Sequence, residues 1–262
     1  MDSFLYTAVT AAKNAGKYIQ GARRNLVKVD HKGRADLVTN VDKTSEQMIV
    51  SHILNRFPDH AILAEENQHT DSQSEYVWVI DPLDGTTNYV HGYQHYAVSI
   101  ALQQKNKTIV GVVYNPWQDE LYTAVRGKGA FLNDEPIHVS ETGNLSDSMV
   151  ATGIPYEIGE SWHRSMQLFQ RFYAVTHGVR RDGSAALDLC YVAAGRFDGF
   201  WEFELHPWDV AAGILIVQEA GGIATNLDSQ ASGIHDTFIL GTNPKIHPQM
   251  LQTIREVKQN GD

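Results

Sequence analysis

A strand-like run that ends in two closely spaced acids constrains this chain more than any other part of its sequence. The apolar residues 76–80 lead into Asp81–Thr87 (DPLDGTT), which predicts a strand that ends at Asp81. The glycine and threonines free backbone N–H groups and offer a hydroxyl at a helix start, where phosphate can bind. Carboxylates for a cation beside donors for an anion indicate metal-assisted phosphate chemistry. A strand, a proline turn and an Asp-capped helix without function also fit.

Composition excludes several other classes of protein. The chain has 262 residues, of which 42% are hydrophobic and 20% charged, as expected for a compact enzyme of one large domain or two closely packed halves. A net charge of -10 without a basic block argues against nucleic-acid or anionic-membrane partners. Cys190 is the only cysteine, which excludes a disulfide framework and a thiolate metal site. Without a basic leader or an apolar run of about 18 residues, a cytoplasmic location is expected.

The spacing of apolar residues divides the chain into two halves of different type. Residues 2–23 have helical spacing, and Thr39 with Asp42 forms a capping-box pattern before a second helix. Strand-like runs at 61–64, 95–102, 108–114 and 120–125 predict an α+β half with an antiparallel sheet. Strands then alternate with helices, which predicts an α/β half. The expected strands are 148–153, 174–179, 197–203 and 238–240, and the expected helices are 162–172, 184–194, 208–220 and 247–258.

Six acids stand at the ends of these elements: Asp42, Glu65, Glu66, Asp81, Asp84 and Asp209. Taken alone, Asp42 and Asp209 each fit a capping or first-turn acid, whereas Glu65, Glu66 and Asp81 follow strands, where sites of α/β proteins are commonly built. Five motifs occur in the order DLVTNVD (36–42), AEE (64–66), WVIDPLDGTTN (78–88), RGKGAF (126–131) and HPWDVAAG (206–213). Together they resemble the inositol monophosphatase family of magnesium-dependent, lithium-sensitive phosphatases. The resemblance covers nearly the whole chain.

The resemblance implies a fold and a cofactor. The fold is a layered α-β-α-β-α sandwich, one phosphatase domain over residues 1–262 with sub-regions 1–145 and 146–262, and a homodimer is expected. The cofactor is Mg²⁺, two or three ions per site. In the matching motifs, Glu65, Asp81 and the carbonyl of Leu83 hold the first ion, Asp81, Asp84 and Asp209 the second, and Glu65 with waters a third.

The same resemblance assigns the catalytic roles. Thr86, partnered by Asp42, orients the attacking water, with Glu65 also counted as catalytic, and the backbone N–H groups of Gly85, Thr86 and Thr87 hold the phosphate. Hydrolysis then proceeds by in-line attack of an activated water. Glu66 has a supporting role.

Substrate recognition is assigned to the second half. Glu202 matches the glutamate that binds a substrate hydroxyl, although Glu204 lies on the same face if the strand continues. Gly183, Ser184 and Ala185 line the pocket, to which Asp84 and Asp209 also contribute. Arg180 and Asp182 flank this segment, and an ion-pair role for Arg180 is an equal alternative. Lys32 lies next to the place of the family's loop lysine, where this chain has His31. A basic group there would support the phosphate or the water network of the third metal when the loop closes, and a solvated loop lysine without a direct role is an alternative of at least equal weight.

These assignments predict a Mg²⁺-dependent phosphomonoesterase that hydrolyses inositol monophosphate or a related polyol phosphate. The same metal site would serve NADP(H) or fructose 1,6-bisphosphate, and only the pocket around residues 155–205 discriminates between these substrates. A regulatory binding protein with this fold is the alternative outside catalysis. Serine-hydrolase, P-loop and zinc-protease motifs are absent from the sequence.

Overall fold

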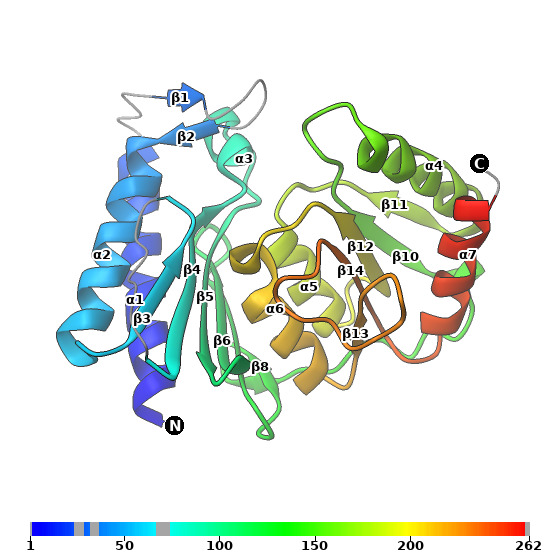
Figure 1. Ribbon diagram of the computed structural model, residues 1–262. Helices are drawn as coiled ribbons and strands as arrows, with labels where there is room; N and C mark the ends of the chain where they lie inside the picture. Colours follow the sequence, from blue (N-terminus) through cyan, green and yellow to red (C-terminus); the bar gives the residue numbers. More distant parts are fainter. Residues whose placement is uncertain (1, 24–28, 32–36, 67–73, 260–262) are drawn as a thin grey trace.

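The computed structural model describes residues 2–23, 29–31, 37–66 and 74–259. These residues form five layers: two outer helices, a seven-stranded sheet, two central helices, a five-stranded sheet and two further helices (Figure 1). This is the predicted α-β-α-β-α sandwich. No helix of the described residues is long and apolar enough to cross a membrane.

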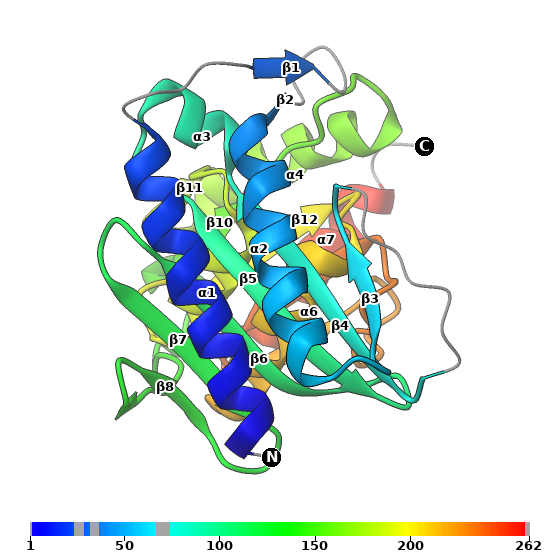
Figure 2. The same ribbon diagram turned by 90° about the vertical axis from the view of Figure 1, so that its left-hand side faces the viewer.

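The first layer consists of α1 (Asp2–Ala22) and α2 (Asn40–Arg56), which lie side by side across the seven-stranded sheet (Figure 2). The predicted capping box starts α2, because Thr39 Oγ1 accepts from Val41 N and Asp42 Oδ2 accepts from Thr39 N. The segment before α2 contains a short hairpin of β1 (Val29–His31) and β2 (Leu37–Thr39). Ala, Ile and Val side chains of both helices pack on the sheet.

The seven-stranded sheet follows chain order. Its strands are β3 (Ala61–Ala64), β4 (Tyr76–Asp84), β5 (Ala97–Gln104), β6 (Lys107–Asn115), β7 (Glu120–Val125), β8 (Ala130–Leu132) and β9 (Glu135–Pro136). β3 is parallel to β4, and all later pairs are antiparallel. The prediction that the central strand ends at Asp81 is wrong. β4 continues to Asp84, and its register with β5 shifts between Asp81 and Asp84.

The five-stranded sheet is mixed. Its strands, in spatial order, are β11 (Gly178–Arg180), β10 (Met149–Thr152), β12 (Gly199–Phe203), β14 (Phe238–Thr242) and β13 (Ile223–Thr225). β10 is parallel to β11 and β12, whereas β14 is antiparallel to β12 and β13. The outer helices are α4 (Glu160–Val175) and α7 (His247–Gln259), and the 3-10 turn Leu145–Asp147 precedes β10. The strand predicted from residue 174 is too early, because α4 runs through Val175.

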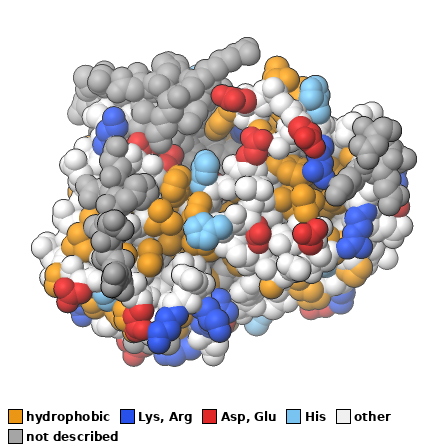
Figure 3. All heavy atoms as spheres, viewed as in Figure 1, with side chains coloured by type: hydrophobic (Ala, Val, Ile, Leu, Met, Phe, Trp, Pro, Cys, Tyr) orange, Lys and Arg blue, Asp and Glu red, His pale blue; other side chains and the backbone are white. Residues whose placement is uncertain are grey.

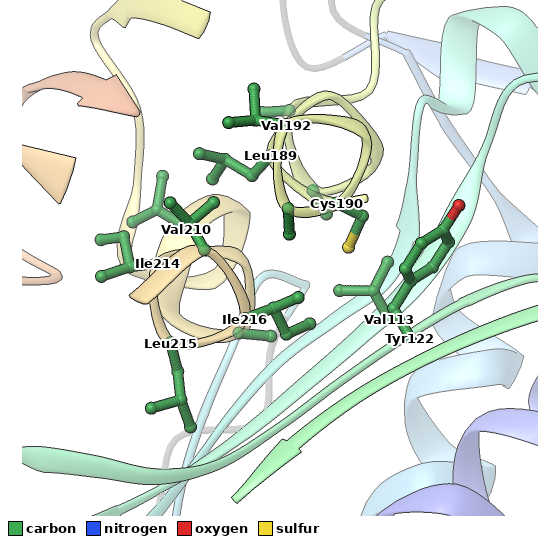
Figure 4. Packing of buried hydrophobic residues seen from close by; sticks show 14 of the residues in the cluster. Val113, Tyr122, Leu189, Cys190, Val192, Val210, Ile214, Leu215 and Ile216 are labelled. Carbon is green, nitrogen blue, oxygen red and sulfur yellow. The ribbon is translucent and has the colours of Figure 1, made fainter. Parts of the chain in front are cut away.

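The central helices α5 (Ala185–Ala193) and α6 (Pro207–Glu219) are buried on all sides. Figure 4 shows their Leu, Ile and Val side chains against each other and against Val113 of β6. α6 lies directly on β6, since a Cβ at Gly111 would come within 2.9 Å of the Ala212 carbonyl oxygen. Cys190 is a buried free thiol whose pKa burial raises well above its ordinary value. Both helices begin at the same end of the molecule, where the functional residues gather.

Candidate active site

A cleft of about 370 Å³ opens where the two sheets face each other across the starts of α5 and α6. Acidic and histidine side chains gather over the middle of the face that Figure 3 shows. The cleft is lined by the end of β4 and the start of α3 (Thr86–His91), by the residues after β10, and by those before α5 and α6. From the predicted set, its lining includes Glu65, Asp81, Leu83, Asp84, Gly85, Thr86, Thr87, Gly183, Ser184, Ala185, Glu202, Glu204 and Asp209.

The irregular end of β4 shapes the first wall of this cleft. Pro82 lacks an N–H group and cannot donate to the neighbouring strand. Its carbonyl oxygen accepts a hydrogen bond from Ser45 Oγ on α2 (2.9 Å). Leu83 N donates to Asp81 Oδ1 (2.9 Å), which closes the turn between them. Leu83 therefore buries its side chain in the core while its backbone lies at the cleft.

Charge in this wall is strongly negative. Burial raises the pKa of Asp81 well above its ordinary value, and the carboxylates of Glu65, Asp84 and Asp209 raise it further. These four acids come from the end of β3, the end of β4 and the start of α6. Hard divalent cations such as Mg²⁺ prefer this all-oxygen donor set and would relieve the repulsion. The residues present thus fit a magnesium site.

Asp84 joins the two halves of the molecule. Its Oδ2 accepts from Ser184 Oγ (2.6 Å) and from Ala186 N (2.9 Å) at the start of α5. Burial raises the pKa of Asp84, against the lowering effect of these hydrogen bonds. Ser184 was predicted to line the pocket for the substrate. It does line the cleft, but its hydroxyl already holds Asp84.

Thr86 and Asp42 are adjacent, as the resemblance implied. Thr86 Oγ1 lies 2.7 Å from Asp42 Oδ1 and 2.9 Å from the Leu83 carbonyl oxygen. One hydroxyl proton cannot serve both acceptors, so either Asp42 is ionised and accepts it, or a protonated Asp42 donates while Thr86 donates to Leu83. Burial raises the pKa of Asp42, and the hydrogen bonds from Thr39 and Thr86 lower it. The pair can therefore exchange a proton at the edge of the cleft.

Gly85 provides the tight turn from β4 into α3. Its φ of 88° lies in the left-handed region, and a Cβ there would come within 2.9 Å of the His95 carbonyl oxygen. Only glycine fits both constraints. The turn places residues 85–87 along the cleft lining.

The two neighbouring glutamates differ in position. Glu65 follows β3, donates its N–H to Ile80 O (3.2 Å) and lines the cleft. Glu66 is not among the lining residues, and its N–H donates to Glu46 Oε2 (2.8 Å). The structure thus brings Glu65 to the acids and places Glu66 behind it.

Asp209 is both a capping acid of α6 and an acid of the cleft. It is the third residue of α6, and its Oδ2 accepts from His206 N (2.7 Å). It also lines the cleft within electrostatic reach of Asp81 and Glu202. The N-terminal turn of α6 thus fixes a carboxylate at the cleft.

Glu202 dominates the opposite wall. A Cβ at Gly153 would lie 1.8 Å from Glu202 Oε1, so the glutamate occupies space that any larger residue at 153 would take. Burial raises the pKa of Glu202 well above its ordinary value, neighbouring acids raise it further, and Arg181 opposes them. Glu204 also lines the cleft, but β12 ends at Phe203 and Glu204 has a φ of 61°. Strand alternation therefore does not relate the two side chains.

Several cleft residues, among them Arg181 and Tyr156, were not named individually from the sequence, and the predicted Arg180 lies elsewhere. Arg180 is exposed, donates to the Val179 carbonyl (3.4 Å) and is not among the lining residues. Its neighbour Arg181 lines the cleft instead. Tyr156, in the segment after β10, also lines it. Position after the carboxyl end of a strand, which identified Asp81, was the available signal for Tyr156.

The loop before β2 was predicted to supply a basic group. Lys32 lies outside the described residues. Of His31, the structure describes only the backbone, in β1.

Comparisons with known proteins agree on one family. The model of the inositol monophosphatase family matches residues 1–259. An inositol-1-monophosphatase of Synechocystis sp. is 43% identical, over 99% of this chain and 91% of its own length. A protein of Vibrio cholerae named Nus factor SuhB is 42% identical, over 98% and 97%. The solved structure of an inositol monophosphatase from Anabaena (Nostoc) sp. superimposes with a TM-score of 0.86, at 42% identity over 97% of this chain and 96% of that one.

Proposed function

Because the chain belongs to the inositol monophosphatase family, we propose that it is a Mg²⁺-dependent phosphomonoesterase acting on inositol monophosphate or a related small polyol phosphate. The cluster of Glu65, Asp81, Asp84 and Asp209 around one cleft carries this proposal. Residues of both sub-regions, 1–145 and 146–262, line the cleft, so we treat the chain as one phosphatase domain.

The acids divide into overlapping donor sets. Glu65, Asp81 and the Leu83 carbonyl would hold one magnesium ion, and Asp81, Asp84 and Asp209 a second, with Glu65 and water for a third. When bound, the ions supply Lewis-acid stabilisation of the phosphate charge and lower the pKa of a water molecule. The protein fixes these donors beforehand, through the turn that Ser45 anchors and through the bonds from Ser184 and Ala186 to Asp84.

Proton removal is assigned to Thr86 and Asp42. The hydroxyl of Thr86 faces the cleft and is 2.7 Å from the buried Asp42 carboxyl, so a proton taken by Thr86 passes to Asp42 over one hydrogen bond. Thr39 N and Thr39 Oγ1 hold the other oxygen of Asp42, at 2.9 and 2.5 Å. The backbone N–H groups of Gly85, Thr86 and Thr87 orient the phosphate.

The charge of the cleft favours a neutral polyol as the organic part of the substrate. Among the described lining residues Arg181 is the only lysine or arginine. Seven acids line the same cleft: Glu65, Asp81, Asp84, Glu157, Glu202, Glu204 and Asp209. Magnesium compensates the acids at the phosphate, but only Arg181 among the described lining residues could pair with a second phosphate, and Glu204 would repel it. Hydroxyl groups can instead form hydrogen bonds with Glu202 and Glu204. A monophosphate is therefore preferred over NADP(H) or fructose 1,6-bisphosphate.

A panel of substrates tests the proposal. Phosphate release is measured from inositol 1-phosphate, NADP, fructose 1,6-bisphosphate and adenosine 3′,5′-bisphosphate with Mg²⁺, and then with added Li⁺. We expect inositol 1-phosphate to give the largest kcat/KM and lithium to inhibit its hydrolysis. A larger kcat/KM for NADP or for either bisphosphate would overturn the choice of substrate. Absence of Mg²⁺-dependent phosphate release from all four compounds would overturn the assignment as a phosphatase.

A binding role is the second candidate, because one relative is named Nus factor SuhB. The chain's net charge of -10 makes a protein partner in a transcription complex more favourable than direct contact with nucleic acid. Transcription reconstituted with the source organism's RNA polymerase tests this role. If binding alone matters, the wild type and Asp84→Asn should change transcription equally. If neither protein changes transcription, this candidate is excluded.

A further inference from the structure

A second group of possible ligands lies outside the cleft. His95 precedes β5, Asp182 lies in the turn before α5, and Asp188 is on α5. One potential ligand atom from each residue lies within 4.8 Å of the other two. None of the three residues lines the cleft. The group therefore joins the two halves of the molecule at a separate place.

Within the described part of the chain, two buried atoms of this group have no hydrogen-bond partner and form only a long ion pair with each other when His95 is protonated. His95 is 6% exposed and Asp188 is 1% exposed. Among the described residues, neither His95 Nε2 nor Asp188 Oδ1 has a hydrogen-bond partner. They face each other at 3.6 Å, which is too long for a hydrogen bond. Because buried polar atoms are nearly always paired, the gap between them points to a ligand.

The surroundings favour a cation. Burial lowers the pKa of His95, but the direct interaction with the Asp188 side chain and the charges of Asp188, Asp182 and Asp84 raise it overall. Tyr93 Oη is 3.4 Å from Asp182 Oδ1 and can donate to it. With a neutral imidazole, the three ligands carry two negative charges. A divalent ion would neutralise them.

We propose that His95, Asp182 and Asp188 form a binding site for a divalent transition-metal ion of the Zn²⁺ type, separate from the magnesium cleft. An imidazole nitrogen with two carboxylate oxygens suits Zn²⁺, whereas Mg²⁺ is usually bound by oxygen alone. Ligand distances of about 2.0–2.2 Å agree with the 3.6 Å separation of His95 and Asp188. Asp182, which is only half-buried, can move to close the wider distances.

Such an ion would brace the wall that holds Asp84. Asn88 Nδ2 already donates to the His95 and Asp182 carbonyl oxygens, at 2.7 Å each. Asp182 is followed by Ser184 and Ala186, which donate to Asp84. A metal that ties His95 to Asp182 and Asp188 would fix the same junction from behind. The site is structural, and its existence does not depend on the proposed phosphatase activity.

Cobalt binding tests the site on the full chain. The protein is stripped with a chelator, dialysed against Co²⁺ with a large excess of Mg²⁺ to fill the cleft, and analysed for retained cobalt and visible absorption. We expect one Co²⁺ per chain with an absorption band that Zn²⁺ abolishes. His95→Gln and Asp182→Asn should lose both signals. Asp209→Asn, which alters only the cleft, should keep them.

Three results would overturn the proposal. The first is that the wild type retains no cobalt. The second is that His95→Gln has the cobalt content and spectrum of the wild type. The third is that Asp209→Asn loses its cobalt while the two site variants keep theirs. If His95→Gln does not fold, the half-buried Asp182→Asn decides. A wild-type cobalt spectrum in Asp182→Asn would then contradict the proposed site.

Discussion

The two walls of the cleft differ in how they are built. The first wall, from the ends of β3 and β4, is held by hydrogen bonds, both within its own turn, as from Leu83 N to Asp81 Oδ1 (2.9 Å), and from other elements, as from Ser184 Oγ to Asp84 Oδ2 (2.6 Å). The second wall, after β10 and around β12, depends on packing between distant segments, as where Glu202 fills the space beside Gly153.

This difference indicates a division of labour. Hydrogen bonds to its backbone and carboxylates preserve the geometry of the first wall, which any phosphomonoester would use. The second wall can change by single substitutions without disturbing the acids. We therefore expect the first wall to set the chemistry and the second to set the substrate, and the following variants test that division.

Asp84→Asn should have the largest effect. Removing one carboxylate from the metal donors while keeping its shape should lower kcat/KM by about 10³-fold, the upper range for loss of a preorganised electrostatic group. The loss should be equal for inositol 1-phosphate and p-nitrophenyl phosphate. Circular dichroism checks that the variant is folded. A wild-type rate at saturating Mg²⁺ would contradict the assignment.

Asp42→Asn should remove about 10²-fold of kcat/KM, as expected for loss of a proton acceptor. Burial raises the Asp42 pKa, so the carboxyl becomes an ionised acceptor only as pH rises through that raised value. Wild-type kcat/KM should rise with pH over this range, and the variant should lack the rise. Thr86→Ser, which keeps a hydroxyl, is the control and should retain most activity. An unchanged pH profile in Asp42→Asn would exclude it as the acceptor.

Glu202→Ala should act on the substrate rather than on the chemistry. We expect kcat/KM for inositol 1-phosphate to fall about 30-fold, as for loss of a hydrogen bond to a substrate hydroxyl, with little change for p-nitrophenyl phosphate. Glu202→Gln should lose less, because the raised Glu202 pKa means that the amide resembles the protonated acid. Equal losses on both substrates would place Glu202 in the chemical step.

Arg181→Ala should have the smallest effect. Arg181 is exposed at the rim, where charge interactions are weak. We expect KM for inositol 1-phosphate to rise about threefold with kcat unchanged. Arg180→Ala is the matched control, because Arg180 is exposed but outside the cleft lining, and it should leave both constants unchanged. A larger rise of KM in Arg180→Ala than in Arg181→Ala would contradict the assignment of Arg181 to the cleft.

Sequence reasoning recovered what depends on local pattern. The amphipathic α1, the capping box at Thr39 and Asp42 and the layered fold all follow from spacing within a few residues or from the ordered motifs. The extension of β4 past Asp81 was not predicted, because it depends on an anchor from Ser45 of α2.

Features set by tertiary packing were harder to predict. Periodicity cannot tell whether Arg180 or Arg181 faces the cleft, since the turn between β11 and α5 decides it. The proximity of His95 to Asp188, 93 positions later in the chain, was equally invisible. The second case depends on how the two halves face each other.

Gly153→Ala tests the central division most directly, because it adds one methyl group whose three nearest atoms all belong to the Glu202 carboxyl group, the nearest at 1.8 Å. The measurement is the ratio of kcat/KM for inositol 1-phosphate to that for p-nitrophenyl phosphate, in wild type, Gly153→Ala and Asp84→Asn. We predict that the ratio falls about 10-fold in Gly153→Ala and stays constant in Asp84→Asn. An unchanged ratio in Gly153→Ala, or a shifted one in Asp84→Asn, would contradict the account.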